Sequence, residues 1–323
     1  MTVLIDEHDD EFLAVAGQAV RASGGAAALE SLGWWDLLGN LDDASARDAV
    51  FALFRAQGRE LASSPALGGI TALPFLEGTG LAPGSVVAAL RRQSHRSGTV
   101  WVVVGDLAGR AVLFADPDRG VHVVDPDAVE LTLIEVPGGL EVHEAVFDLS
   151  ARDALAGVDE QAWPRSARLG RVAAAHEILG AAERAVDLAV DHAVDREQFG
   201  QPIGGFQAVR HLLAWAKTDC VAIDAVVRKA IASLADPPAR FDEVVKALAG
   251  RNGRRACERS LQVLGGIGFT AEHPHHHHHS RVLLLDAVLG TSSELRRDLG
   301  TWLRSTGDDP GYPAALLDGP GSD

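Results

Sequence analysis

The feature that most constrains the fold is a run of helical periodicity over residues 168–304. Apolar side chains recur on one face of four long segments, at 171–193, 205–234, 241–264 and 280–304. Amphipathic helices of similar length that are joined by short links bury their apolar faces by packing as an antiparallel bundle. The sequence therefore predicts a four-helix bundle in a C-terminal domain that spans residues 151–306.

Two other patterns precede the bundle. Residues 3–62 are helical in period, and the paired Trp34 and Trp35 are expected to anchor a core. Residues 63–85 are rich in Gly, Pro and Ser, which predicts a connection with one short apolar element. From about residue 86 to 149 the period changes to two, which predicts a small antiparallel sheet or barrel built from short β-branched runs at 100–104, 111–114, 121–124 and 131–134.

The predicted fold class is mainly α with a small β domain. It comprises an N-terminal helical domain (1–85), a reduced antiparallel β-domain (86–150), the bundle (151–306) and a loose tail (307–323).

Composition limits the possible partners and the compartment. The 323-residue chain carries a formal net charge of −16, and no basic stripe is present, which argues against a nucleic-acid surface. The acidic N-terminus does not resemble a signal peptide, and no apolar run is long enough to cross a membrane. Cys220 and Cys257 lie in apolar helical patterns and are expected to be buried free thiols. We therefore expect a cytoplasmic protein.

Two short strings stand out within the bundle. The first is Asp195-Arg196-Glu197-Gln198-Phe199-Gly200, followed by Phe206-Gln207, and the second is QVLGGIGFT from Gln262 to Thr270. Two glycines directly after an apolar run allow the backbone itself to contact a ligand. Each string alone has an ordinary structural explanation, because Arg196 can cap a helix, Phe199 can fill a core and Gly-Gly can end a helix.

Together, and in this order, the two strings resemble those of the flavin-dependent acyl-CoA dehydrogenases. For the first string, the resemblance implies that Arg196 binds the FAD pyrophosphate through charge-assisted hydrogen bonds. It also implies that Gln207 hydrogen-bonds nearby, and that Phe199 packs on the adenosine half with Gln198 beside it.

For the second string, the resemblance implies that Gln262, Gly265 and Gly266 approach the adenine and ribose. In homotetrameric members of the family these strings hold the FAD of the neighbouring subunit. The resemblance is strong over about residues 168–304 and loose over residues 1–62.

The chain departs from the family in its β segment and at its catalytic base. The motifs with which family β-domains cup the flavin ring are absent from residues 63–150, and the segment is too short for the usual eight strands. Dehydrogenation needs a carboxylate that faces the ring. The two family positions for this base fall at Leu289 and near Gly170, and neither is a carboxylate. We therefore assign no catalytic residue.

Other carboxylates of the bundle are candidates for a relocated base. Glu177, Glu183 and Asp187 follow Gly170 along the same segment, and Asp286 precedes Leu289 by one helical turn. We expect solvated or helix-pairing roles for them.

The histidine run His275–His279 is not expected to form a physiological metal site, because neighbouring histidines on a helix point in different directions. The spacing of Glu272, His273, His277 and Arg281 resembles a variant in steroid-degrading actinobacterial members of the family.

These observations lead to one main hypothesis and two alternatives. The main hypothesis is a shortened, non-catalytic subunit of an α2β2 acyl-CoA dehydrogenase. This chain would hold the adenosine end of FAD, and a longer partner would supply the ring pocket, the base and most of the acyl-CoA site. The first alternative is a redox-inactive homo-oligomer with a binding or scaffolding role. The second is a self-sufficient dehydrogenase with a relocated base such as Glu177.

Overall fold

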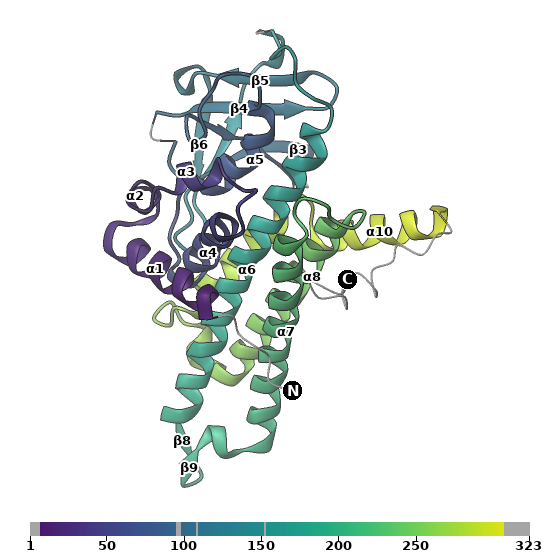
Figure 1. Cartoon of the computed structure of the whole chain (residues 1–323). Helices are drawn as coiled ribbons and strands as arrows, with labels where there is room; N and C mark the ends of the chain where they lie inside the picture. Colours follow the sequence, from purple (N-terminus) through teal and green to yellow (C-terminus); the bar gives the residue numbers. More distant parts are fainter. Residues whose placement is uncertain (1–6, 95–97, 108, 152, 307–323) are drawn as a thin grey trace.

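The computed structural model describes residues 7–94, 98–107, 109–151 and 153–306. Figure 1 shows a β layer at one end, a group of N-terminal helices beside it, and a long helical bundle that extends away from both. Helix α6 (Ala162–Asp195) runs through the molecule from the β layer to the far tip of the bundle. No helix in the described part of the chain combines the length and the apolar character that crossing a bilayer demands.

The N-terminal part is helical, as predicted. Trp34 is fully buried and makes edge-on contacts with the rings of Trp35 and Phe54, so it is the expected core anchor, whereas Trp35 is only half-buried. The helices are α1 (Glu7–Ser23), α2 (Gly25–Ser31), α3 (Trp34–Leu38), α4 (Ala44–Glu60) and α5 (Ala66–Leu76).

Residues 63–85 contain one apolar element, as expected, and it is α5, an 11-residue helix that is nearly all buried. Its Gly68 and Gly69 resemble loop residues in the sequence but serve close packing. A Cβ on Gly68 would lie 3.1 Å from the carbonyl oxygen of Ala88, and one on Gly69 would lie 2.5 Å from the Trp35 ring. Long-range packing therefore overrides the local signal for a turn.

Two small sheets form the β layer, with strand orders β1-β4-β5 and β2-β3-β7-β6. All strand pairs in these sheets are antiparallel except β1 with β4, which is parallel and departs from the expected antiparallel arrangement. The strands are β1 (Val86–Ala88), β2 (Leu90–Ser94), β3 (Gly98–Val104), β4 (Ala111–Asp116), β5 (Gly120–Val124), β6 (Glu130–Ile134) and β7 (Val142–Val146). Strands β1, β2 and β7 were not predicted individually.

The bundle contains the predicted helices with one correction. Residues 280–304 do not form a single helix, because the chain turns between α9 and α10 with Leu289 at φ 59° and Gly290 at φ 97°. The histidine run is the first turn of α9. The helices that follow α6 are α7 (Gln207–Ala232), α8 (Phe241–Leu264), α9 (His275–Ala287) and α10 (Ser292–Thr306). The predicted tail after Thr306 lies outside the described residues, and the domain boundaries at residues 85 and 150 stay predictions.

Helices α4 and α6 cross in close contact through two glycines. A Cβ on Gly58 would lie 2.1 Å from the carbonyl oxygen of Glu177, and one on Gly180 would lie 1.9 Å from that of Arg55. Beside this crossing, Arg55 and Arg59 donate to Glu183, and Arg59 also donates to Asp187. Glu183 and Asp187 therefore pair helices, as expected.

One buried arginine joins α9 to three other segments. Arg281 is fully buried, and it donates to the carboxylate of Glu177 on α6, to the carbonyl oxygen of Ala62 after α4, and to that of Gly138 in the β layer. Burial raises the pKa of Glu177, while the charge of Arg281 opposes that shift. Glu177 thus has a helix-pairing role.

Removing one member of this buried pair should destabilise the chain strongly. We expect Glu177→Gln and Arg281→Met each to lower the free energy of unfolding by about 3–5 kcal/mol, because each leaves a buried group without its partner. The exposed pair of Arg165 with Glu77 offers a control, for which Arg165→Met should cost less than about 1 kcal/mol. Urea denaturation measures both, and equal losses for the buried and exposed pairs would contradict this role of Arg281.

Acid should destabilise the fold through buried neutral histidines. Burial lowers the pKa of His176 to about 4, of His275 to about 4 and of His278 to about 3. In the unfolded chain a histidine titrates near pH 6.5, so only the unfolded state takes up protons as the pH falls below that value. The stabilisation is complete above about pH 6.5, and it should fall by up to about 1.4 kcal/mol per pH unit for each histidine between about pH 6.5 and the folded pKa.

Urea titrations at about pH 7 and about pH 5 would measure this loss. The variant His278→Gln should reduce the pH dependence, because burial lowers the pKa of His278. An identical pH slope in His278→Gln and in the parent chain would exclude His278 as a source.

Candidate functional site

The first predicted string forms a tight hairpin at the tip of the bundle. Strands β8 (Glu197–Gln198) and β9 (Gln201–Pro202) pair around a two-residue turn of Phe199 and Gly200. Both turn residues have positive φ, 54° and 83°, which a type I′ hairpin turn requires. This conformation is uncommon for a phenylalanine, and it leaves the Phe199 ring 94% exposed. Figure 1 shows the hairpin at the end of the molecule farthest from the β layer.

The second string ends helix α8 at the same tip. Gly265 has φ 62° and begins a 3-10 turn that continues to Phe269. A Cβ on Gly265 or on Gly266 would meet no atom within 4 Å, so the backbone here is bare and open. Gln262, one helical turn earlier, is exposed.

A small apolar cluster holds the two strings together. Its members come from α6, α7, α8 and the short turn after the hairpin, and they include Ala193, Ile203, Val209, Val263 and Leu264. Two strings more than fifty residues apart in the sequence therefore lie at one end of the bundle.

The polar side chains of this tip are directed to solvent. Arg196, Gln198 and Gln207 are exposed. Arg196 ends helix α6, and within the described part of the chain its guanidinium has no hydrogen-bond or ion-pair partner. An unpaired arginine beside open glycine backbone can bind a diphosphate. The seven residues predicted to bind a dinucleotide thus lie at one exposed tip, and their binding role stays a prediction.

Exposed apolar side chains surround these polar groups. Val194, Phe199, Trp215, Ile267 and Phe269 are each between 40% and 94% exposed. Clustered exposed apolar side chains mark contact sites for a ligand or a partner.

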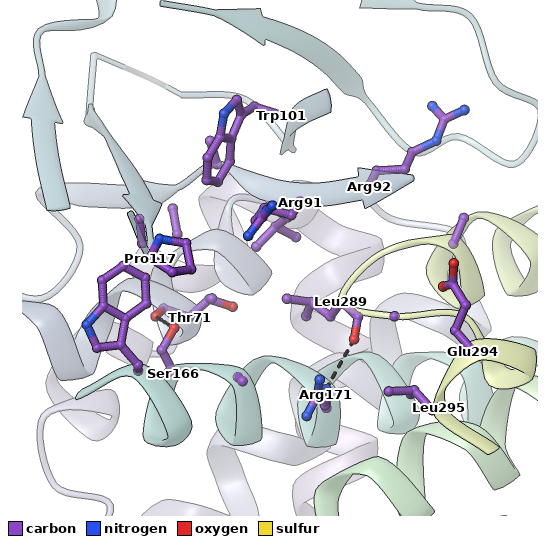
Figure 2. A pocket seen from close by; sticks show the side chains of 18 of the residues that line it. Thr71, Arg91, Arg92, Trp101, Pro117, Ser166, Arg171, Leu289, Glu294 and Leu295 are labelled. Atoms are coloured by element: carbon purple, nitrogen blue, oxygen red, sulfur yellow. Dashed lines mark hydrogen bonds between the residues drawn. The ribbon is translucent and has the colours of Figure 1, made fainter. Parts of the chain in front are cut away.

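A separate cleft lies at the opposite end of α6, between the β layer and the bundle. Its volume is about 630 Å³, and residues of β2, β3, α5, α6 and the α9–α10 turn line it. Figure 2 shows Trp101 and Arg91 on one side of this cleft, Thr71 and Ser166 on another, and Leu289 opposite them.

Aromatic and arginine side chains form much of the cleft wall. Phe75 and Trp163 contact each other edge to face, with ring centroids 5.1 Å apart. The guanidinium of Arg91 lies over the Trp101 ring at 5.8 Å. Sequence reasoning missed these wall residues, because only the folded chain brings α5, α6 and the paired strands β2 and β3 together around the cleft.

The two family positions for the catalytic base meet in this cleft. A Cβ on Gly170 would lie 2.8 Å from Cδ1 of Leu289, so the leucine side chain lies directly over the glycine. The carboxylates weighed as substitutes do not line the cleft. Glu177 binds Arg281, and Asp286 accepts from the backbone N–H and the hydroxyl of Ser292 at the start of α10.

Two carboxylates do line the cleft, and sequence reasoning missed both. Glu294 accepts from the backbone N–H of Thr291 at 3.0 Å and from its hydroxyl at 2.8 Å, and Asp298 lies one turn further along α10. The signal for Glu294 was the string Gly290-Thr291-Ser292-Ser293-Glu294, which places an acceptor three residues after a threonine. Its bonds to Thr291 give Glu294 a capping role.

Two cations, the buried Lys246 and the partly buried Arg171, fix the turn that carries Leu289. Nζ of Lys246 donates to the carbonyl oxygens of Asp286 and Gly290, and Nε of Arg171 donates to that of Leu289 at 3.1 Å (Figure 2). Burial lowers the pKa of Lys246 to about 8. These bonds satisfy the last carbonyl groups of α9 and the turn.

The histidine run packs into the bundle. His275 and His278 are buried, and His275 bonds to the carbonyl oxygen of Cys257. Among the residues that the structure describes, no three potential ligands gather in a way that can hold a metal ion. Cys220 and Cys257 are buried free thiols, as expected.

Comparison with known proteins shows which family the C-terminal domain resembles. Residues 165–303 match the family model described as acyl-CoA dehydrogenase, C-terminal domain. Acyl-CoA dehydrogenase FadE34 of Mycobacterium tuberculosis is 31% identical over 217 residues, which is 66% of this chain and 29% of that protein. Residues 165–303 therefore match the C-terminal domain of the acyl-CoA dehydrogenase family, and the described chain shares the fold of the solved structures below.

Solved structures agree with this fold class, which is mainly α with a small β domain. A Tcur3481–Tcur3483 steroid ACAD variant superimposes with a TM-score of 0.73 at 22% identity, covering 93% of this chain and 99% of that chain. The ChsE4–ChsE5 complex from Mycobacterium tuberculosis gives a TM-score of 0.69 at 18% identity, with coverages of 95% and 100%. The sequence matches to FadE34 and to two further relatives cover only 29%, 64% and 65% of their lengths.

The exposed hairpin ring should contribute nothing to the stability of the isolated chain. We expect Phe199→Ala to change the free energy of unfolding by less than about 0.5 kcal/mol, because the ring is 94% exposed. Val263→Ala, in the apolar cluster beneath the hairpin, should cost about 1–3 kcal/mol. Chemical denaturation of both variants tests this, and a large loss for Phe199→Ala would show that the ring packs within its own chain.

Proposed function

We propose that this chain is the non-catalytic subunit of a heteromeric FAD-dependent acyl-CoA dehydrogenase. In this assembly its bundle tip holds the adenosine and pyrophosphate half of FAD at the subunit interface. A longer partner subunit provides the ring pocket, the catalytic base and most of the site for the acyl-CoA thioester, whose acyl group carries a steroid ring system. The bound flavin would supply the hydride acceptor for α,β-dehydrogenation.

The observation that carries this proposal is the separation of the two ends of α6. Arg171 lines the cleft and Arg196 ends the same helix 25 residues later. At about 1.5 Å of rise per residue, these positions lie about 37 Å apart. A dinucleotide extended between its two ring systems is shorter than this span. A cofactor held at the tip therefore has its flavin ring outside this chain, in a neighbouring subunit.

The residues at the tip fit the adenosine half of such a cofactor. Arg196 offers charged donors that no other described residue binds, Phe199 offers an exposed ring face, and Gly265 and Gly266 offer backbone with no side chain in the way. These groups bind and orient an anionic dinucleotide, and they move no proton.

The cleft end supports a non-catalytic role. Leu289 fills the space over Gly170, so both family positions for the base present hydrocarbon or a bare backbone. Glu177, the candidate for a relocated base, accepts a hydrogen bond from Arg281 in a buried ion pair. A heteromeric assembly finds support in the names of two structural neighbours, a Tcur3481–Tcur3483 steroid ACAD and a ChsE4–ChsE5 complex.

Expression with and without a longer homologue distinguishes the proposal from the two alternatives. Flavin-bound, dye-reducing protein only on co-expression is the expected result. Colourless protein under both conditions would support the redox-inactive homo-oligomer. Active flavoprotein from this chain alone would support the self-sufficient enzyme and contradict the proposal.

Arg196→Ala should weaken FAD retention in the co-expressed complex. The loss of a charge-assisted contact should cost about 2–3 kcal/mol, or roughly 30- to 150-fold in Kd. Flavin content after gel filtration and a fluorescence titration of the apo-complex would measure this. Arg304→Ala, an exposed arginine near the end of α10, is the matched control and should leave the Kd unchanged. A normal Kd in Arg196→Ala would contradict the assignment of this residue.

A further inference from the structure

A second concave site lies on the other side of the contact between α5 and α6. This groove has a volume of about 550 Å³, and its walls come from α3, the α3–α4 link, α5, α6 and the segment after α7. The hydroxyl of Ser166 donates to the carbonyl oxygen of Thr71 at 2.7 Å, and this α5–α6 contact separates the groove from the larger cleft. Adjacent residues of α6 face the two sites, because Ala167 lines the cleft and Arg168 lines the groove.

The walls of the groove are aliphatic. Seven leucines line it, among them Leu41, Leu73, Leu169 and Leu234, and no aromatic side chain is among its described lining residues. Leu41, Leu73 and Leu234 are half-exposed, so a ligand can cover more of their surface. The larger cleft differs in kind, because Phe75, Trp101 and Trp163 form its walls. Branched aliphatic walls without ring faces suit a flexible hydrocarbon chain.

The rim of the groove is positive in an otherwise acidic protein. Three arginines and two carboxylates line the groove, giving a formal net charge of +1, whereas the whole chain carries −16. One carboxylate, that of Glu77, is already bound by both Nη atoms of Arg165 at 2.8 and 2.5 Å. The guanidinium of Arg168 has no hydrogen-bond or ion-pair partner in the described part of the chain.

A second arginine, Arg47, lies at the same rim. Nη1 of Arg47 donates to the carbonyl oxygens of Leu41 and Asp42 at 2.9 and 2.8 Å, which fixes the guanidinium at the wall of the groove. Its Nη2 makes no hydrogen bond to any described residue. A carboxylate between two such guanidinium groups forms charge-assisted hydrogen bonds.

We propose that this groove binds an aliphatic carboxylate, with the hydrocarbon chain along the leucines and the carboxylate on Arg168 and Arg47. The site is distinct from both the cleft and the bundle tip. The inference does not depend on the shared flavin site, and its test uses this chain alone.

Decanoate, titrated by calorimetry at concentrations below its self-association, is the probe. The expected result is saturable binding of one decanoate per chain. Decanol should bind more weakly, because it has the same chain but no charge. Arg168→Ala should weaken decanoate binding roughly tenfold and should leave decanol binding unchanged. Arg304→Ala is the matched control and should leave both unchanged.

Two filling variants locate the site. Leu73→Trp fills the groove and should abolish binding, whereas Ala167→Trp fills the larger cleft and should leave binding intact. The thermal unfolding midpoint of each variant confirms that it is folded, and Arg168→Ala, a surface change, tests the site even where Leu73→Trp does not fold.

Three outcomes would overturn the proposal. The first is that decanoate shows no saturable binding, and the second is that Arg168→Ala and the parent chain bind decanoate with equal affinity. The third is that Ala167→Trp loses binding while Leu73→Trp retains it. The last result would place the ligand in the larger cleft.

Discussion

The arrangement of the three parts depends on the hydrogen bonds of one buried cation. A guanidinium without solvent access needs partners for its donors, since an unpaired buried charge costs several kcal/mol. Arg281 finds them on α6, after α4 and in the β layer, at Glu177, Ala62 and Gly138. Gly138 has φ 104°, and a Cβ there would lie 2.6 Å from the carbonyl oxygen of His277, so only a glycine lets α9 come this close. The β layer, the N-terminal helices and the bundle must therefore assemble together.

This anchoring of α9 fixes where the next turn can be. Lys246 and Arg171 bind the carbonyl groups of the turn, and Asp286 binds the first residue of α10. All of these bonds involve the backbone of residues 286–292, and none involves the side chain of Leu289. These bonds therefore hold the backbone of position 289 beside Gly170 without using the leucine side chain. A carboxylate can be replaced by leucine at this point without rebuilding the turn.

The sequence predicted the long periodic elements and the two strings, because those signals are local. The helical period of α6 and the string around Phe199 can each be recognised from neighbouring residues. The missed features depend on distant contacts. Helix α5 looks like a loop because its Gly68 and Gly69 serve packing against β1 and Trp35. The break between α9 and α10 lies in an apolar run, and carbonyl–cation bonds across the bundle stabilise it. The carboxylate of Glu294 and the arginines of the cleft come together only in the folded chain.

The side chains at the two ends of α6 differ in how far they are paired within the chain, and this difference supports a role in an assembly. At the cleft end, Lys246 is fully buried and Arg171 is paired with Asp242 within the chain. At the tip, Arg196 has no side-chain partner among the described residues, and a left-handed turn that disfavours its residue type holds the Phe199 ring in solvent. The Phe199 ring contacts the Phe206 ring edge to face but stays 94% exposed, and Arg196 has no side-chain partner among the described residues, so folding of this chain alone explains neither position. A contact that lies outside this chain explains both, because it would pair the guanidinium and cover the ring.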